Sequence, residues 1–281
     1  MKTMAWVVVT CLAAAFPALA APPSPVAAST TSPLTVYAAG SLTGALADIA
    51  KQYTAATGEA VRIVNGPAGL LRERIEKGEA ADVYISANME HPEKLAAEGK
   101  ATSPVVFARN ALCVQTLPDA GMTSANLLDR LLAPGVRIGT STPGADPGGD
   151  YAWQFFARAE TVRAGARANL EAKAKKLVGG PVAPTIPGNV GAAKYFLQHH
   201  VVDVFFGYCS SHDATPDPDL SKVEVPANLS LPVDYGMSVV LREGDPARRA
   251  ASFRFALYAM SPAAQERLPA YGFRAVAAPE H

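Results

Sequence analysis

The feature that most constrains the fold is a regular alternation of short apolar segments with amphipathic ones. Residues 34–38 are typical of a buried strand, and apolar residues then recur at helical spacing from Leu42 to Tyr53, stopping before Gly58. The same pairing repeats, with strands expected at 61–64 and 82–86 and helices at 70–77 and 92–98. Such alternation predicts parallel strands with helices on both faces of the sheet.

A second alternating stretch follows, which implies a second sheet. Further strands are expected at 136–139, 201–206 and 236–241, and helices at 151–159, 164–177, 189–200, 247–260 and 262–268. In the helix at 247–260 the inner face is expected to hold Ala250, Phe253, Ala256, Leu257 and Met260. The predicted fold is α/β with two lobes, each a mostly parallel sheet flanked by helices, because about 250 residues are many for one core.

The lobes are expected to exchange the chain twice. Lobe 1 is predicted to comprise residues 34–110 and 234–281, and lobe 2 residues 111–233. The crossings are expected near "FARNALC" and near "LPVDYGM". A hinge of two strands is therefore expected between the lobes.

The first residues read as an export signal. Lys2 precedes an apolar run and the small-x-small sequence of residues 18–20, so residues 1–20 are predicted to be a cleaved signal peptide. The run is too short to span a bilayer, and a lipoprotein anchor at Cys11 is the competing interpretation. Residues 21–33, rich in Pro, Ala, Ser and Thr, are expected to form a disordered leader. The predicted location is the periplasm.

The charge balance argues against partners that need a basic surface, and the cysteine content leaves room for one disulfide. The chain has 25 Lys and Arg against 25 Asp and Glu, and removing Lys2 leaves 24 against 25. Such a balance gives no basic field for nucleic acid or an anionic membrane. Cys113 and Cys209 remain after cleavage. In an exported protein they form either one disulfide or two buried thiols.

Small residues occur where the predicted strands end and helices begin. Ser41, Ala68, Ala87, Val190 and Tyr208 all lie near such joints. Ligands of open parallel sheets bind beyond the carboxyl ends of the strands, and helix N-termini attract anions through their free N–H groups. The joint at Ser41 therefore suits a compact oxyanion. Small residues are also common in tight turns, and Ser41 can be a simple N-cap.

Four segments together resemble a known family. "VYAAGSLTGAL", "IEKGEAADVYISAN", "PGNVGAAKYFL" and "YGFRAV" are similar to sequences of the periplasmic molybdate-binding proteins of ABC importers. The resemblance implies two lobes that close over a tetrahedral oxyanion held by neutral donors, with no cofactor and no metal ligation. It assigns the Ser41 hydroxyl and N–H, the N–H groups of Ala87 and Val190, and the Tyr208 phenol to the ligand. It also implies a monomer that delivers molybdate or tungstate to a membrane permease.

One segment departs from that family. Where it usually has serines, this chain has residues 66–69, "GPAG", so that Ala68 stands in place of a hydroxyl donor. The N–H of Ala68 or Gly69 remains a candidate donor, and Arg72 is either a substitute or a surface side chain. The loop from Thr142 to Asp150 is long and acidic for a hinge, and its contact with the ligand is an open question. A different small anion or an organic acid is therefore the alternative ligand.

Three other classes of function are less well supported. Residues 210–213, "SSHD", contain the letters of a hydrolytic triad, but sequence neighbours rarely converge in triad geometry. His199 and His200 are adjacent and so point to different faces of a helix, which does not favour a metal site. A scaffold module would not need donors gathered at several strand ends. The sequence predicts a binding protein and no enzyme.

Overall fold

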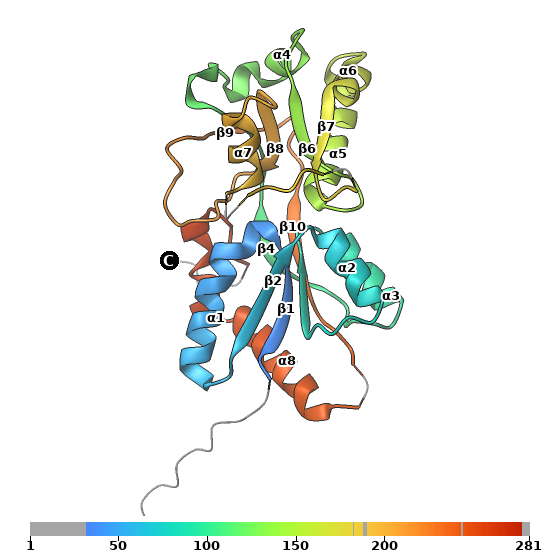
Figure 1. Ribbon diagram of the computed structural model, residues 1–281, viewed down its shortest axis with the longest axis vertical. Helices are drawn as coiled ribbons and strands as arrows, with labels where there is room; N and C mark the ends of the chain where they lie inside the picture. Colours follow the sequence, from blue (N-terminus) through green and yellow to red (C-terminus); the bar gives the residue numbers. More distant parts are fainter. Residues whose placement is uncertain (1–31, 182, 188–189, 243, 277–281) are drawn as a thin grey trace, which may run out of the picture. The chain divides into compact units, whose positions relative to one another are not determined.

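The computed structural model describes residues 32–181, 183–187, 190–242 and 244–276 (Figure 1). The predicted signal peptide at 1–20 and most of the predicted leader lie outside the described residues. Two five-stranded sheets organise residues 32–276, and the second lies above the first in Figure 1. Helices flank both sheets, and the predicted two-lobed α/β class is confirmed.

The first sheet has the strand order β2-β1-β3-β10-β4. Its strands are β1 (Leu34–Ala39), β2 (Val61–Gly66), β3 (Val83–Ser86), β4 (Val105–Asn110) and β10 (Val233–Val239). Its helices are α1 (Thr43–Thr57), α2 (Ala68–Glu76), α3 (Glu90–Ala97), α8 (Pro246–Ala259) and α9 (Pro262–Gln265). Short 3-10 turns at Gly40–Leu42 and Leu268–Tyr271 belong to the same unit, which we call lobe 1.

The second sheet has the strand order β7-β6-β8-β5-β9. Its strands are β5 (Leu112–Thr116), β6 (Ile138–Ser141), β7 (Ala174–Val178), β8 (Val204–Tyr208) and β9 (Ser221–Glu224). Its helices are α4 (Leu127–Leu132), α5 (Pro147–Val162), α6 (Ala166–Lys173) and α7 (Ala192–Gln198), with 3-10 turns at Pro118–Ala120 and Ser124–Asn126. We call this unit lobe 2.

Each sheet is mixed, because a single strand runs against the others. β10 is antiparallel to both β3 and β4, and β5 is antiparallel to both β8 and β9. These two strands are the ones through which the chain enters a lobe from the other lobe. β4 passes into β5 at Ala111, and β10 follows the segment after β9. The lobe boundaries proposed from the sequence stay a prediction, although the strands divide between the sheets near the same positions.

Several elements differ from the sequence prediction. The helix expected at 164–177 ends at Lys173, and residues 174–178 form β7 at the edge of the second sheet. Lys175 and Lys176 are exposed there, as is common on edge strands. Strand β9 was not predicted, and β4 and β5 were expected only as one strand of the hinge near "FARNALC". Helix α5 begins at Pro147 and not at Tyr151, because the Asp146 side chain caps it.

The buried face of α8 is also not the predicted one. Ala251, Phe255 and Ala259 are buried, whereas Phe253 is 40% exposed and Leu257 is 71% exposed. The Phe255 ring packs edge-on against Tyr53 of α1, with ring centroids 5.2 Å apart. Both stripes of this helix are apolar, so spacing alone does not decide which one faces the sheet.

A disulfide staples lobe 2 close to the hinge. Cys113 on β5 is bonded to Cys209, the residue after β8, across a sequence separation of 96 residues. A loop of this length corresponds to a stabilisation of about 4 to 5 kcal/mol in the chain-entropy model. The bridge fixes the end of β8, where Tyr208 lies, to the strand that enters from lobe 1.

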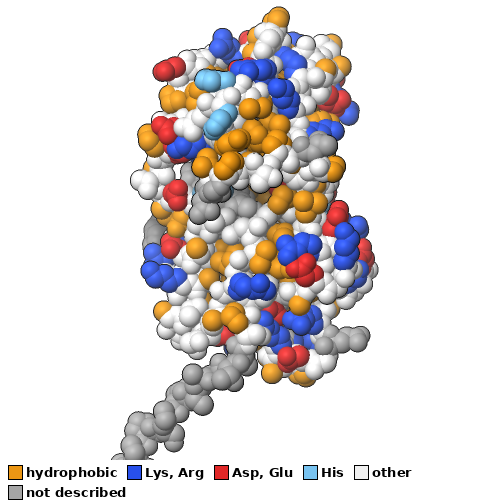
Figure 2. Space-filling model, viewed as in Figure 1, with side chains coloured by type: hydrophobic (Ala, Val, Ile, Leu, Met, Phe, Trp, Pro, Cys, Tyr) orange, Lys and Arg blue, Asp and Glu red, His pale blue; other side chains and the backbone are white. Residues whose placement is uncertain are grey.

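Charges of both signs are interspersed on the surface drawn in Figure 2, in keeping with the formal net charge of zero. In the part of the chain that the structure describes, no helix has the length and apolar character needed to cross a bilayer.

Candidate functional site

A cavity of about 540 Å³ lies where the carboxyl ends of strands from both lobes meet. Lobe 1 contributes residues at or just after the ends of β1, β2 and β3: Ala39, Gly40, Ser41, Gly66, Pro67 and Ala87. Lobe 2 contributes residues after or at the ends of β6, β7 and β8, among them Ser141, Val178, Tyr208 and Ser210. This is the position at which ligands of open α/β sheets bind.

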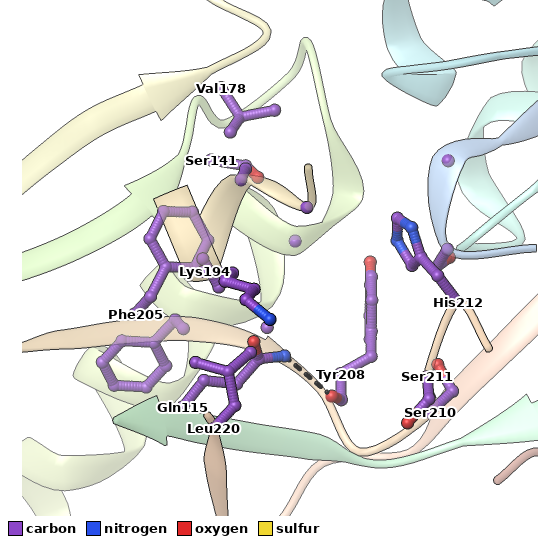
Figure 3. Close-up of a pocket in the computed structure, with 18 of the residues that line it drawn as sticks. Gln115, Ser141, Val178, Lys194, Phe205, Tyr208, Ser210, Ser211, His212 and Leu220 are labelled. Atoms are coloured by element: carbon purple, nitrogen blue, oxygen red, sulfur yellow. Dashed lines mark hydrogen bonds between the residues drawn. The ribbon is translucent and has the colours of Figure 1, made fainter. Parts of the chain in front are cut away.

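Four of the six ligand-binding residues predicted from the sequence line this cavity. Ser41 and Ala87 approach it from lobe 1, and Val190 and Tyr208 from lobe 2. Figure 3 shows Tyr208 at the centre of the cavity, with His212 on one side and Lys194 on the other. Residues separated by more than 160 positions in the sequence are thus brought to one site.

The other two predicted residues, Ala68 and Gly69, are not among the lining residues. Ala68 is fully buried, and its carbonyl accepts a hydrogen bond of 2.7 Å from the Tyr84 hydroxyl. A side chain at Gly69 would collide with the carbonyl oxygens of Gly144 and Ala145 in lobe 2. The first turn of α2 therefore forms a contact between the lobes, and the cavity wall before it is made by Gly66 and Pro67.

Arg72 is occupied elsewhere and does not line the cavity. Its Nε atom lies 3.5 Å from a carboxylate oxygen of Glu76, one helical turn along α2. The structure therefore does not support Arg72 as a substitute for the missing serine.

Ser41 belongs to a buried hydrogen-bonded chain that reaches from one lobe to the other. Its hydroxyl lies 2.8 Å from the Tyr235 hydroxyl, which accepts a bond of 3.2 Å from the Asn110 side-chain amide. The same amide nitrogen donates to the Ser210 hydroxyl at 2.9 Å. Asn110, Ser210 and Tyr235 are at most 7% exposed.

The direction of the protons in this chain follows from its chemistry. The Asn110 side-chain oxygen accepts from the Ala111 N–H at 2.8 Å, so the amide nitrogen faces Tyr235 and can only donate to it. Either hydroxyl of the Ser41–Tyr235 pair can donate, but Ser41 is the only acceptor that the described residues offer the Tyr235 proton. The arrangement that leaves no polar atom of this chain unpaired therefore has Tyr235 donating to the Ser41 oxygen. Ser41 keeps its own proton for another acceptor, and the cavity is the space it lines. Burial raises the pKa of the Tyr235 phenol well above its usual range, which keeps it protonated.

Tyr208 is a buried donor without an acceptor. Its hydroxyl oxygen has no hydrogen-bond partner among the described residues. Burial raises the pKa of the Tyr208 phenol well above its usual range, so the proton stays on the oxygen. A buried polar group without a partner costs about 1 to 3 kcal/mol. An acceptor atom supplied by a ligand would remove that cost.

The loop between Thr142 and Asp150 reaches the cavity. Asp146 and Gly148 line it, and the Asp146 carboxylate accepts a bond of 2.9 Å from the Gly148 N–H at the start of α5. Burial raises the pKa of Asp146 to about 6, against the opposing effect of that hydrogen bond. Asp150 accepts instead from the Gly144 N–H at 2.8 Å. The wall of the cavity therefore includes one acid that titrates near neutral pH.

Two lysines that sequence reasoning missed also line the cavity. Lys222 donates to the backbone oxygens of Cys209 and Ser210 at 3.0 and 2.5 Å and to the Ser211 hydroxyl at 2.6 Å. Burial lowers its pKa. Lys194 forms ion pairs of 3.0 and 2.8 Å with Asp217 and Asp219. The sequence around the two lysines, such as "PDPDLSK", has no regular spacing from which their position in the cavity could have been predicted.

Residues 210–213, which include the residue types of a hydrolytic triad, do not have the geometry of a catalytic triad. Ser210 and Ser211 bind Asn110 and Lys222, and no hydrogen bond joins either of them to the His212 side chain in the described residues. Burial lowers the pKa of His212. Within the described ranges, no group of three or more His, Cys, Asp or Glu is placed to hold a metal ion.

Two α/β lobes joined by crossing strands, with a cavity at the strand ends, define the class of two-lobed solute-binding proteins. The chain belongs to the family of bacterial extracellular solute-binding proteins, whose model matches residues 34–274. It is 36% identical over 185 residues to an uncharacterized protein of Pasteurella multocida, covering 65% of this chain and 77% of that protein.

Solved structures with the same fold bind different ligands. The periplasmic molybdate-binding protein of Azotobacter vinelandii is 23% identical, with a TM-score of 0.68 over 85% of this chain and 98% of that one. PEB3 of Campylobacter jejuni bound to L-phospholactate is 19% identical, with a TM-score of 0.66 over 88% of this chain and all of that one. At these identities the likeness establishes the fold.

The contact at Gly69 makes a prediction about lobe closure. Gly69→Ala adds a methyl group 2.7 Å from the Ala145 oxygen, while alanine is the better helix former by about 1 kcal/mol. We expect folded lobes that do not meet, seen as a larger radius of gyration in small-angle X-ray scattering. Gly191→Ala is the control, because its added methyl group meets nothing within 4 Å. An unchanged radius for Gly69→Ala would contradict the steric role.

Proposed function

We propose that this chain is the periplasmic component of an ABC importer and captures an anion with a tetrahedral oxyanion group, of the molybdate or tungstate type. The observation that carries the proposal is the Tyr208 hydroxyl, a buried donor that lacks a partner and belongs to a residue of the cavity wall. The resemblance of the segments around Ser41, Ala87 and Val190 to molybdate-binding proteins, and the similarity to the Azotobacter protein, support it.

The donors of the cavity suit an ion that keeps its charge. Ser41 retains a proton for the ligand, and Tyr208 has one with no other acceptor among the described residues. Backbone N–H groups at Ala87 and Val190 complete the proposed set from both lobes. Hydrogen bonds to a charged group contribute about 1.5 to 3 kcal/mol each after the loss of the water they replace, so a set of such donors can hold an anion without a salt bridge.

Closure couples capture to delivery in this proposal. Only the closed arrangement brings Ser41 and Tyr208 to one ion, so the ligand stabilises that arrangement. The membrane permease then recognises the closed monomer. Residues 1–20, the proposed export signal, would bring the chain to the periplasm. An organic acid remains the second candidate ligand, because Ala68 stands where molybdate-binding proteins usually have serine.

Two single substitutions test the proposed donors and separate binding from folding. Ser41→Ala should weaken molybdate binding at least tenfold and also lower stability, because the Tyr235 proton loses its acceptor. Tyr208→Phe should weaken binding to a similar degree without lowering the free energy of unfolding, since the deleted hydroxyl has no described partner. Calorimetry and urea denaturation give both quantities. Wild-type affinity in either variant would remove that residue from the site.

Tyr235 should act on the ligand through Ser41. Tyr235→Phe removes the proton that occupies the Ser41 oxygen, so the serine hydroxyl is free to turn away from the cavity. We expect affinity for molybdate to fall about tenfold, measured by calorimetry. Tyr84→Phe is the matched control, because it deletes a buried phenol bound to the Ala68 carbonyl and outside the cavity. Equal losses of affinity in the two variants would show that the effect is one of folding.

Asp146 predicts a pH dependence with a definite sign. Its folded pKa of about 6 lies above the usual value, so its contribution to stability is present at low pH and is lost as pH rises through about 6. The same deprotonation adds a negative charge to the wall, and affinity for molybdate and sulfate should fall from about pH 5 to 7. Asp146→Asn keeps an oxygen for the cap and should flatten this dependence in calorimetry. A variant that follows the wild-type curve would show that Asp146 does not face the ion.

A further inference from the structure

We infer that the site prefers an organic anion to a bare oxyanion such as molybdate: a tetrahedral head group, phosphate, phosphonate or sulfonate in type, joined to an uncharged apolar body. The head occupies the proposed oxyanion site between Ser41 and Tyr208, so the inference rests on the proposed function. The body lies in an extension of the cavity inside lobe 2.

The volume of the cavity is the first observation. A tetrahedral oxyanion has five heavy atoms, and at about the 30 Å³ that a water molecule occupies in the liquid it fills roughly 150 Å³. The cavity measures about 540 Å³. Most of it would remain empty or filled with water around a bare ion. Cavities of roughly 300 to 1,000 Å³ are typical of sites for small organic molecules.

The lining of the extension is the second observation. Four apolar residues of lobe 2 form the wall of the extension: Val178, Ala192, Phe205 and Leu220. All four belong to the smaller hydrophobic cluster or pack against it. Figure 3 shows Val178, Phe205 and Leu220 on the side of Tyr208 opposite His212. A bare dianion gains nothing from this surface, whereas each methylene group buried there contributes about 0.8 kcal/mol.

The charges of the extension exclude a second charged group on the ligand. Lys194 is paired with Asp217 and Asp219, so its charge is already compensated. Gln115 and Gln198 also line the cavity and carry no charge; Gln115 donates to the Tyr208 backbone oxygen at 3.2 Å and Gln198 to the Asp219 carboxylate at 3.3 Å. On the other side of Tyr208, the Lys222 ammonium group donates its three hydrogen bonds to oxygen atoms of the protein. A body with its own carboxylate or ammonium group would lack a free partner in the extension.

The test compares a series of anions on the mature protein. Inorganic phosphate, methylphosphonate, propylphosphonate and phenylphosphonate share a tetrahedral head and differ in the apolar body. Each buried methylene corresponds to about a fourfold gain in affinity. We expect propylphosphonate to bind at least tenfold more tightly than phosphate by calorimetry. Phosphate or molybdate binding as tightly as every organic member would overturn the inference.

A substitution in the extension locates the body. Ala192→Leu on α7 fills part of the extension and should remove the preference for propylphosphonate while leaving phosphate affinity unchanged. Ala168→Leu, on the exposed face of α6, is the control for adding the same side chain elsewhere. Retained phosphate binding in Ala192→Leu shows that the variant is folded. A preference that survives in Ala192→Leu would contradict the proposed position.

The outcomes for the head and the body can be distinguished. If Ser41→Ala weakens every member of the series equally but no organic member is preferred, the proposed oxyanion site stands and the organic ligand is wrong. If Ser41→Ala changes no affinity, or no anion binds to the wild type, the oxyanion site is wrong and this inference fails with it.

Discussion

The buried hydrogen-bonded chain from Ser41 through Tyr235 and Asn110 to Ser210 is the interaction on which the site depends. Tyr235 lies on β10 and Asn110 ends β4, and both strands belong to the crossings between the lobes. The chain therefore passes through the hinge and connects a donor of lobe 1 with the wall of lobe 2. Because Asn110, Ser210 and Tyr235 are buried, a hydrogen bond lost among them leaves a polar atom unpaired at a cost of about 1 to 3 kcal/mol. The hydrogen bonding of Ser41 and the arrangement of the lobes therefore depend on each other.

The electrostatics of the cavity are set by how its lysines are paired within the protein. Its two lysines are engaged by protein atoms, Lys194 by carboxylates and Lys222 by backbone and hydroxyl oxygens. Neither presents an uncommitted proton to the cavity, although the Lys222 charge has no carboxylate within its hydrogen-bonded shell. The positive charge of Lys222 therefore offsets part of the cost of placing an anion beside Asp146. Specificity then rests with oriented neutral donors, which discriminate by geometry more than by charge.

The sequence predicted what local spacing controls. The βα units around Ser41 and Ala87 have clear periodicity, and strand ends in such units lie at one edge of a sheet, so four lining residues were found. The bounds of β5 and the existence of β9 were missed because both strands are short and their pairing partners are distant in the sequence. The role of Gly69 was missed because it depends on carbonyl groups of Gly144 and Ala145, which only the docking of the lobes brings near. Spacing within one element does not contain that information.

The two ends of the cavity have different relations to lobe movement. Ser41 and Ala87 belong to lobe 1, and so the oxyanion site is complete only when the lobes meet at Gly69 and at Gly44, whose missing side chain leaves room for the His212 backbone oxygen. The proposed apolar extension is lined by Phe205, Leu220 and Val178, which all belong to lobe 2, so its wall does not require contact with lobe 1. An organic anion would therefore first place its body in lobe 2, and its head would then draw lobe 1 onto it. In such a sequence of events the body sets which ligand is held, and the oxyanion head sets whether the protein closes.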